Sequence, residues 1–273
     1  MTQRACVGVF DSGIGGLSVW REIIRLMPSV STLYLADQAH LPYGTRSPEE
    51  IQNLALGIAR FLLSEGVSLI VVACNTASGA ALSSLRQALP DTPFVGMEPA
   101  IKPAVERTQT GHVGVLATPT TFRGELFQRL MARFRHRVAI HTATCPGLVQ
   151  RVEDGALDGT EALHHVEACL RPLLTYPIDQ LVLGCTHYPF ARTLIQEVVG
   201  SEVALIDPAP AVARQTKRLL LNHHHPIPSE TKPSHRFITT GQKANLRVPL
   251  ESLLGLQVTV ERATWRDGKL QFA

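Results

Sequence analysis

The sequence predicts an α/β fold of two similar doubly wound domains, each built on a parallel sheet and related to the other by pseudo-symmetry. Short apolar runs rich in Val, Ile and Leu recur along the chain and alternate with segments of helical periodicity. The 273 residues exceed the usual size of one domain, and 45% of them are hydrophobic, so two cores of ordinary volume are expected. Two of the apolar runs also have counterparts, in the same order, in the second half of the chain.

The apolar runs predict six buried strands, and the segments between them predict helices. The runs cover residues 6–10, 33–36, 69–74, 113–117, 181–183 and 203–206. The clearest helix is predicted to begin at Ser47, a suitable cap, with Pro48 at the first helical position and Glu50 completing a capping box. Apolar residues then follow at helical spacing until Gly66, which ends the helix.

The two halves of the chain resemble each other. Residues 7–12 match residues 113–118 at an offset of 106, and residues 69–76 match residues 180–187 at an offset of 111. This repeat predicts a duplicated unit in which Cys74 and Cys185 occupy equivalent strand ends in two facing domains. We expect residues 1–97 plus 208–273 to form the first domain and residues 98–207 the second, with a hinge near residues 97–103.

Composition excludes several classes of protein. The net charge of +3 comes from 26 basic and 23 acidic residues, a balance that does not favour nucleic acid as a partner and is compatible with an anionic small molecule. The apolar stretch at residues 5–10 is too short for the core of a signal peptide or for a membrane span. We therefore expect a cytoplasmic protein that does not associate with membranes.

The five cysteines have no C-x-x-C spacing and give neither a disulfide framework nor a zinc signature. We expect free thiols in a reducing compartment and no metal site. Cys6 and Cys169 are predicted to fill the core, and Cys145 has no setting that indicates reactivity. The run from His223 to His225 lies in a polar stretch bounded by Pro, which favours a solvated loop over a metal site.

Cys74 and Cys185 have a different setting from the other three thiols. Each follows an apolar strand and precedes polar residues, Asn75 and Thr76 in one case and Thr186 and His187 in the other. A buried small hydrophobic residue is the alternative for any free cysteine. However, a thiol between a strand end and a helix N-terminus meets unpaired N–H groups that favour its thiolate form. These two thiols are the candidates for chemistry.

The glycine-rich loop after the first strand begins at Asp11 and admits two interpretations. A dinucleotide loop would use Asp37, at the end of the second strand, to bind a ribose. Against it, Ser18 stands where the third glycine is required, and Asp11 would repel a pyrophosphate. A nest of N–H groups for a carboxylate is favoured. Asp11 then receives a substrate ammonium, orients a catalytic group or caps the turn.

Together these motifs resemble those of bacterial glutamate racemases, in the aspartate/glutamate racemase superfamily. They are residues 9–17, Asp37 with the Pro42–Gly44 segment, residues 73–78 and residues 184–189. Their order and the chain length match the family, so the resemblance covers essentially all 273 residues. Aspartate racemases of the superfamily typically carry Glu where this chain has His187, so the resemblance favours glutamate as substrate.

The resemblance implies an active site between two α/β domains and no cofactor, in particular no pyridoxal phosphate. It implies that Cys74 and Cys185 are the acid/base pair, with Cys74 serving D-glutamate and Cys185 L-glutamate. Asp11 is implied to assist the first thiol, and a Glu153–His187 pair the second, although a solvated carboxylate at a helix end is the alternative for Glu153. The residues that match the substrate-binding motifs are Asp11, Ser12, Pro42, Tyr43, Gly44, Asn75, Thr76, Thr186 and His187.

The expected activity is interconversion of L- and D-glutamate, which supplies D-glutamate for peptidoglycan synthesis, cell-wall biogenesis and cell shape. The alternatives are a related racemase acting on aspartate or another acidic substrate, and an acidic amino-acid binding protein. Some relatives have a secondary partner, such as a cell-wall precursor or DNA gyrase. Because the first strand begins near Cys6, we expect no dependence on a precursor. A homodimer is compatible with the sequence, which leaves the oligomeric state open.

Overall fold

The computed structural model describes residues 5–223 and 232–273 of the chain, which divides into two compact units. The first unit contains residues 1–97 and 209–273, and the second contains residues 98–208. The predicted loop from His223 to His225 lies outside the described residues except for His223, which is exposed. Among the described residues, no helix combines the length and apolar character needed to cross a membrane.

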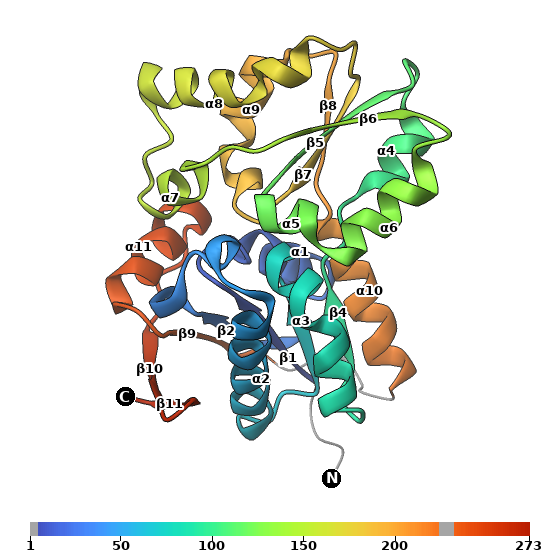
Figure 1. Ribbon diagram of the computed structural model, residues 1–273. Coiled ribbons are helices and arrows are strands. Elements are labelled where there is room, and N and C mark those ends of the chain that lie inside the picture. The colour runs from blue at the N-terminus through green and yellow to red at the C-terminus, as the bar shows by residue number, and fades with distance from the viewer. Residues whose placement is uncertain (1–4, 224–231) are drawn as a thin grey trace. The chain divides into compact units, whose positions relative to one another are not determined.

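The first unit is built on a seven-stranded sheet in the order β11-β10-β9-β2-β1-β3-β4 (Figure 1). All neighbouring strands are parallel except β10 and β11. The strands are β1 (Cys6–Asp11), β2 (Ser31–Ala36), β3 (Leu69–Val72), β4 (Phe94–Gly96), β9 (His235–Thr239), β10 (Val260–Arg266) and β11 (Lys269–Phe272).

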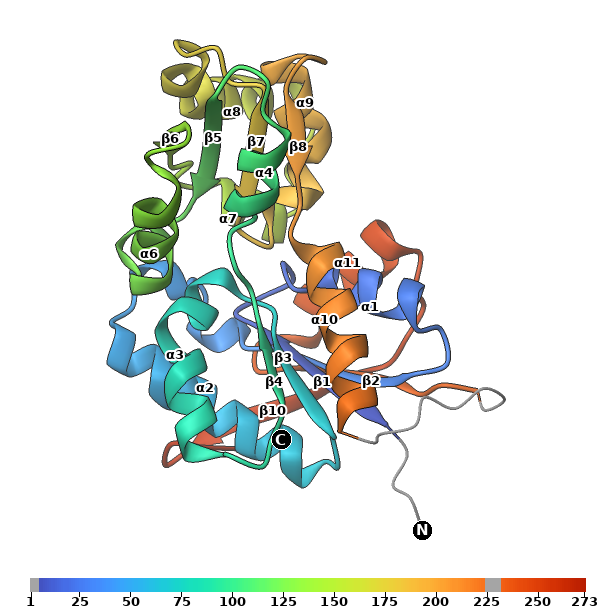
Figure 2. The same ribbon diagram turned by 90° about the vertical axis from the view of Figure 1, so that its right-hand side faces the viewer.

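Helices cover both faces of this sheet. They are α1 (Leu17–Leu26), α2 (Pro48–Ser64), α3 (Asn75–Ala88), α10 (Ala209–Asn222) and α11 (Lys243–Leu254), with short 3-10 turns η1 (Gln38–His40) and η2 (Tyr43–Thr45). α2 packs beside α3 on one face, and α1 beside α10 on the other (Figure 2). Both faces are apolar because side chains alternate along each strand: Phe10 packs toward α2, while Val9 belongs to the opposite face.

The second unit has a four-stranded parallel sheet in the order β6-β5-β7-β8. Its strands are β5 (His112–Ala117), β6 (Ala139–Ala143), β7 (Gln180–Gly184) and β8 (Ala204–Ile206). Its helices are α4 (Ile101–Arg107), α5 (Pro119–Arg123), α6 (Glu125–Phe134), α7 (Leu148–Glu153), α8 (Gly159–Leu174) and α9 (Arg192–Val199), with the 3-10 turn η3 (Tyr188–Ala191). Val113 and Val115 pack with α4 and α6, whereas Gly114 between them faces Leu173 of α8.

The two sheets share one strand order. β2-β1-β3-β4 in the first unit corresponds to β6-β5-β7-β8 in the second, so β1 corresponds to β5 and β3 to β7. These are the two pairs of segments that match in the sequence. The prediction of an α/β fold with parallel sheets is confirmed, and the common strand order supports a duplicated unit.

Local signals predicted the second helix well. Ser47 Oγ accepts a hydrogen bond from Glu50 N at 3.1 Å, Pro48 is the first helical residue, and Gly66 follows the helix at a φ of 81°.

The third strand is shorter than predicted, because β3 ends at Val72 and Cys74 already caps α3. Strands β4, β6, β9, β10 and β11 were not predicted. β6, for example, is partly exposed at the sheet edge and has no continuous apolar run.

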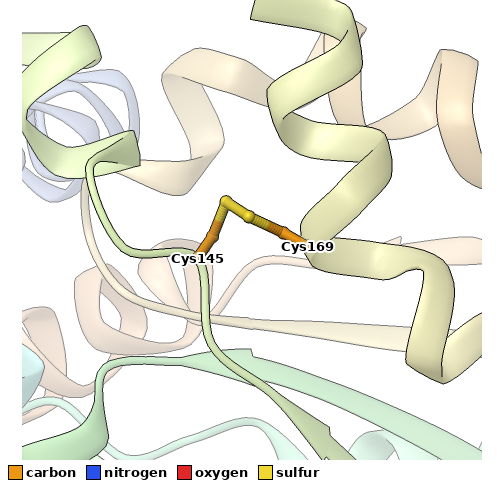
Figure 3. Close-up of a disulfide and its surroundings, with 2 residues drawn as sticks. All are labelled: Cys145 and Cys169. Atoms are coloured by element: carbon orange, nitrogen blue, oxygen red, sulfur yellow. A yellow bond between two sulfur atoms is a disulfide. The ribbon is translucent and has the colours of Figure 1, made fainter.

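Two of the five cysteines are not free, so the prediction of free thiols is wrong for them. Cys145, in the segment after β6, and Cys169, on α8, form a disulfide (Figure 3). Cys169 is only half-buried and is therefore not a core residue. The two residues are 24 positions apart, so no local spacing indicates the pair, and the packing of α8 against β6 brings them together. Cys6, Cys74 and Cys185 form no disulfide among the described residues, and Cys6 packs against the core as predicted.

Candidate active site

In the first unit, Asp11 and Cys74 lie at the carboxyl edge of the sheet. β1 and β3 are neighbouring parallel strands with Phe10 opposite Val72, so residues that follow them lie at the same edge. The Ala73 amide donates to the Phe10 carbonyl at 2.8 Å and extends this pairing to the residue before the thiol. Asp11 is fully buried and Cys74 is 6% exposed. The edge therefore holds an acid and a thiol that bulk water scarcely reaches.

Cys74 is the N-cap of α3. Its Sγ accepts a hydrogen bond from the Ala77 amide at 3.5 Å, and its carbonyl accepts from the Ser78 amide at 2.8 Å. Ser, Thr, Asp and Asn usually occupy this position, where a side chain accepts from an N–H group that has no partner in the helix. The sulfur thus lies at the positive end of a 14-residue helix, which stabilises a thiolate.

The loop after β1 is held tightly against the sheet. Asp11 Oδ1 accepts hydrogen bonds from Gly13 N at 2.8 Å and from Ser12 Oγ at 3.4 Å. A Cβ atom at Gly16 would lie 2.7 Å from the Asp11 Cβ and 3.1 Å from the Ala73 Cβ. Only glycine therefore allows the start of α1 to approach the ends of β1 and β3. This contact places Ser12 beside the buried Asp11 carboxylate.

Asn75 and Thr76 begin α3, directly after the thiol, and both are 6% exposed. Neither Oδ1 nor Nδ2 of Asn75 has a hydrogen-bond partner among the described residues, although both atoms are buried. Buried amides normally have partners, since leaving one unsatisfied costs about 1–3 kcal/mol. An amide of this kind beside a thiol can donate to one polar group of a ligand and accept from another.

The Pro42–Gly44 segment forms η2 and its entrance, and Tyr43 is its buried member. The Tyr43 hydroxyl donates to Asp37 Oδ2 at 2.7 Å. Burial, with the charge of Asp37, raises the pKa of Tyr43 well above 10.0, so this hydroxyl stays protonated. Pro42 is exposed and Gly44 half-buried. The single hydroxyl hydrogen of Tyr43 is therefore used in its hydrogen bond to Asp37.

Asp37 is an anchor that connects segments distant in sequence. Its Oδ1 accepts from Trp265 Nε1 at 2.9 Å and from Thr240 Oγ1 at 2.8 Å, and His40 lies 3.0 Å from its Oδ2. Burial raises the pKa of Asp37, but hydrogen bonds from His40, Trp265 and Tyr43 outweigh it and hold the pKa below 3.8. These contacts occupy the carboxylate, which leaves no acid to bind a ribose. Sequence reasoning missed Trp265 and Thr240, because nothing local links them to Asp37.

In the second unit, Cys185 directly follows β7, which corresponds to β3. Gly184 precedes it, and a Cβ atom there would lie 2.8 Å from the Ala117 Cβ, so glycine is needed for β7 to end this close to β5. Cys185 is 7% exposed, and its carbonyl accepts from the Tyr188 amide at 3.1 Å, which starts η3. Burial, with the charge of Cys185, raises the pKa of Tyr188 well above 10.0, so Tyr188 remains neutral beside the thiol.

His187 connects Cys185 to Glu153. Its Nδ1 lies 3.8 Å from Cys185 Sγ, and its Nε2 lies 2.6 Å from Glu153 Oε1. The side chains of His187 and Glu153 are 3% and 6% exposed, so this carboxylate at the end of α7 is not solvated. Burial lowers the pKa of His187, but its bonds to Cys185 and Glu153 outweigh burial and raise the pKa well above 6.5. The structure therefore favours an imidazolium, which can donate a proton to the Cys185 thiolate and, once neutral, accept one from the thiol.

The proposed site residues thus form two groups, one at the carboxyl edge of each sheet. Asp11, Ser12, Asn75 and Thr76 accompany Cys74, and Thr186, His187 and Glu153 accompany Cys185. Thr186 is buried at 3% exposure. The sequence model of the Asp/Glu/Hydantoin racemase family matches residues 7–216, which include both groups. The chain belongs to this family.

Several proteins that are similar to nearly the whole chain are glutamate racemases. That of Ectopseudomonas mendocina (strain ymp) is 45% identical over 258 residues, which cover 94% of this chain and 98% of that protein. The solved structure of a glutamate racemase isoform from Bacillus anthracis has a TM-score of 0.88 at 33% identity and covers 98% of this chain and 99% of that chain. Escherichia coli glutamate racemase, solved with L-glutamate and the activator UDP-MurNAc-ala, has a TM-score of 0.84 at 33% identity, with coverage of 96% and 98%.

In a racemase of this family, the Glu153–His187 pair has a testable electrostatic role. Replacing Glu153 with Gln should lower the pKa of His187, because an amide does not stabilise the imidazolium as a carboxylate does. We expect a shift of the His187 titration to lower pH in ¹⁵N NMR spectra of the imidazole. Turnover should fall roughly tenfold to a hundredfold, less than the loss of a primary acid/base group.

Asp154→Asn is the matched control, since Asp154 is the exposed neighbour of Glu153. It should leave both the titration and turnover unchanged. If Cys185 is a base of the reaction, the loss in Glu153→Gln should appear mainly in kcat for the direction in which it takes the proton. The kcat/KM values of the two directions must fall together, because the equilibrium constant fixes their ratio. An unchanged His187 titration in Glu153→Gln would contradict the proposed role.

Proposed function

We propose that this chain is a glutamate racemase that interconverts L- and D-glutamate without a cofactor, with Cys74 and Cys185 as the two acid/base residues. The observation that carries the proposal is the equivalence of the two thiols. Each follows the corresponding strand of a repeated unit, β3 or β7, and each is nearly buried among polar side chains. Among the described residues these are two of the three cysteines outside the disulfide, and the third, Cys6, starts β1 at the opposite end of the strand.

The reaction requires two bases of this kind. Racemisation removes the α-proton from one face of the substrate and returns a proton to the other. A single base must either move or wait for the carbanion to turn, whereas two bases reaching the same α-carbon avoid both. One cysteine acts as the thiolate base while the other, as a thiol, donates the proton, and their roles exchange in the reverse direction.

The carbanion needs stabilisation that an electron-sink cofactor would otherwise supply. Hydrogen bonds to the substrate carboxylate and exclusion of water provide it in this proposal. The unsatisfied amide of Asn75 and the hydroxyl groups of Thr76 and Thr186 are the donors. They are 3–6% exposed, so their hydrogen bonds act where water competes little. Asp11, beside the first thiol, receives the substrate ammonium or assists that thiol.

Glutamate is the proposed substrate for two reasons. The relatives named above are glutamate racemases, and this chain has His187 at the position where aspartate racemases of the superfamily typically carry Glu. We propose that D-glutamate made here serves peptidoglycan synthesis in the cytoplasm and that the chain acts as a soluble enzyme, with a homodimer as the proposed assembly. The competing proposal, a racemase for aspartate or another acidic substrate, uses the same two thiols and differs only in the pocket for the side-chain carboxylate.

Circular dichroism of L-glutamate incubated with the pure protein, without added cofactor, tests the function. The signal should decay to zero as the racemic mixture forms, while L-aspartate should change little. The protein should show no pyridoxal phosphate absorption band, and borohydride treatment should leave its activity intact. Equal turnover of L-aspartate would overturn the substrate assignment, and inactivation by borohydride would overturn the cofactor-free mechanism.

A further inference from the structure

A second group of reactive side chains lies in the second unit, apart from the two catalytic thiols. It consists of Cys145, His165 and Cys169, called here the Cys145 cluster. Cys145 follows β6, and Cys169 lies on α8 (Figure 3). His165 lies one turn before Cys169 on the same helix, so both residues face the same side of it. One potential ligand atom from each residue lies within 4.8 Å of the others. None of the three has a part in the racemisation proposed above.

One ring nitrogen of His165 is buried without a hydrogen-bond partner. Its Nε2 atom is shielded from solvent and has no hydrogen-bond partner among the described residues. The ring faces the segment that carries Cys145, since a Cβ atom at Gly147 would lie 3.4 Å from His165 Cε1 and 3.8 Å from Nε2. A buried ring nitrogen left in this way costs free energy unless something binds it. A cation held jointly with the two sulfur atoms would satisfy it.

The cluster borders a depression that an ion can enter. The depression has a volume of about 490 Å³, and its lining includes Thr142, Thr144, His165 and Cys169. Three protein ligands leave one position of a tetrahedral ion open, and water from this depression can fill it. The hydroxyl groups of Thr142 and Thr144 are polar groups on its wall.

We propose that the Cys145 cluster binds one thiophilic divalent cation, with Zn²⁺ as the best fit, when its two cysteines are reduced. Two thiolates and a neutral imidazole form a soft ligand set that suits Zn²⁺ far better than Mg²⁺ or Ca²⁺. At usual bond lengths of about 2.3 Å to sulfur and 2.0 Å to nitrogen, two sulfur ligands of a tetrahedral ion lie about 3.8 Å apart and a sulfur and a nitrogen about 3.5 Å apart. The three ligand atoms already lie within 4.8 Å of one another, so side-chain rotations that separate the two sulfur atoms after reduction bring them to these distances.

The disulfide is then the oxidised, metal-free state of the same cluster. Its formation from the two thiols joins the sulfur atoms and releases two protons and two electrons, which reduce a small-molecule disulfide such as oxidised glutathione to two thiols. Reduction by a dithiol reverses the step. Because each sulfur either bonds to the other sulfur or binds the ion, the two states exclude each other. Metal binding should therefore depend on the redox state of the protein.

Cobalt binding to the full-length protein tests the proposal without reference to racemase activity. The protein is reduced, freed of reductant and titrated with Co²⁺, whose thiolate-to-metal charge-transfer band reports sulfur ligands and whose visible bands report tetrahedral geometry. We expect one equivalent of Co²⁺ with both signatures, displaced by one equivalent of Zn²⁺. Protein oxidised beforehand with oxidised glutathione should lack the bands that belong to the cluster.

Three variants locate the site. Cys145→Ser and Cys169→Ser should each reduce the charge-transfer intensity. His165→Gln should weaken binding at least about tenfold, because losing even a residue that only hydrogen-bonds to a metal ligand has an effect of this size. His165→Gln retains both thiols and the disulfide, so it keeps the test valid if a cysteine variant fails to fold. His164→Gln, at the exposed preceding residue, and Cys6→Ser are controls that should bind like the wild type.

Two outcomes would overturn the proposal. Reduced wild-type protein that binds no Co²⁺ or Zn²⁺ with thiolate signatures would show that the cluster does not bind metal. Binding that persists unchanged in all three cluster variants would place the ion elsewhere, for example at Cys74 or Cys185. Neither outcome affects the proposed racemase function, which the optical assay of glutamate tests separately.

Discussion

Replacing either Cys74 or Cys185 with Ser is expected to reduce racemisation by roughly 10²–10⁴-fold or more, the usual contribution of an acid/base group. Serine keeps the approximate size of the side chain and can still cap α3 at position 74. A serine hydroxyl, however, does not ionise near neutral pH, so the variant lacks the thiolate that acts as the base. The rate of change in the circular dichroism of L- and D-glutamate measures the loss. Cys6→Ser is the matched control and should retain full activity, because Cys6 lies at the start of β1.

A substrate analogue separates the roles of the two thiols. Elimination of chloride from threo-3-chloroglutamate needs one deprotonation and no return of a proton, so one thiol suffices. Cys74→Ser should still eliminate from the enantiomer that Cys185 deprotonates, and Cys185→Ser should show the reverse preference. Thiol alkylation should inactivate the wild type, and saturating glutamate should slow this inactivation. If both variants preferred the same enantiomer, or if one retained full racemisation, the two-base assignment would fail.

Replacing Asp37 with Ala should destabilise the first unit by at least about 3 kcal/mol. The change leaves the buried donors of Thr240 and Tyr43 and the half-buried donor of Trp265 without their acceptor, and each orphaned donor costs about 1–3 kcal/mol. Asp37→Asn should cost less, since it keeps one acceptor oxygen. The chain has two tryptophans, Trp20 and Trp265, and both lie in the first unit. Urea unfolding followed by tryptophan fluorescence therefore measures the stability of this unit.

The dependence on pH gives the same prediction a second readout. The pKa of Asp37 is held below its ordinary value of 3.8 in the folded chain, so its carboxylate contributes stability above pH 3.8. That contribution is lost as the pH falls below 3.8 and passes through the pKa of the folded state. The stability difference between wild type and Asp37→Asn should therefore shrink under acidic conditions. Asp91→Asn, at an exposed carboxylate, is the control and should show neither effect. Equal stability of Asp37→Ala and wild type would contradict the anchoring role.

Much of the fold was predictable because its signals are local. The helix from Pro48 to Ser64 follows from a cap, a proline and a capping box within four residues, and the central strands follow from continuous apolar runs. Several partly buried strands escaped prediction because they have no continuous apolar run. β10, for example, mixes exposed and buried residues, and it acquires its role only when Trp265 reaches Asp37, 228 positions earlier in the chain.

The sequence by itself determined the α/β class, the repeated unit and the position of Cys74 and Cys185 after corresponding strands, since each depends on periodicity and order along the chain. Only the tertiary structure decided which distant side chains meet. Glu153 and His187 are 34 positions apart and Cys145 and Cys169 are 24 apart, and no local pattern specifies either contact. Such contacts arise when helices pack on a sheet, because burial then fixes side-chain positions that the chain alone leaves free.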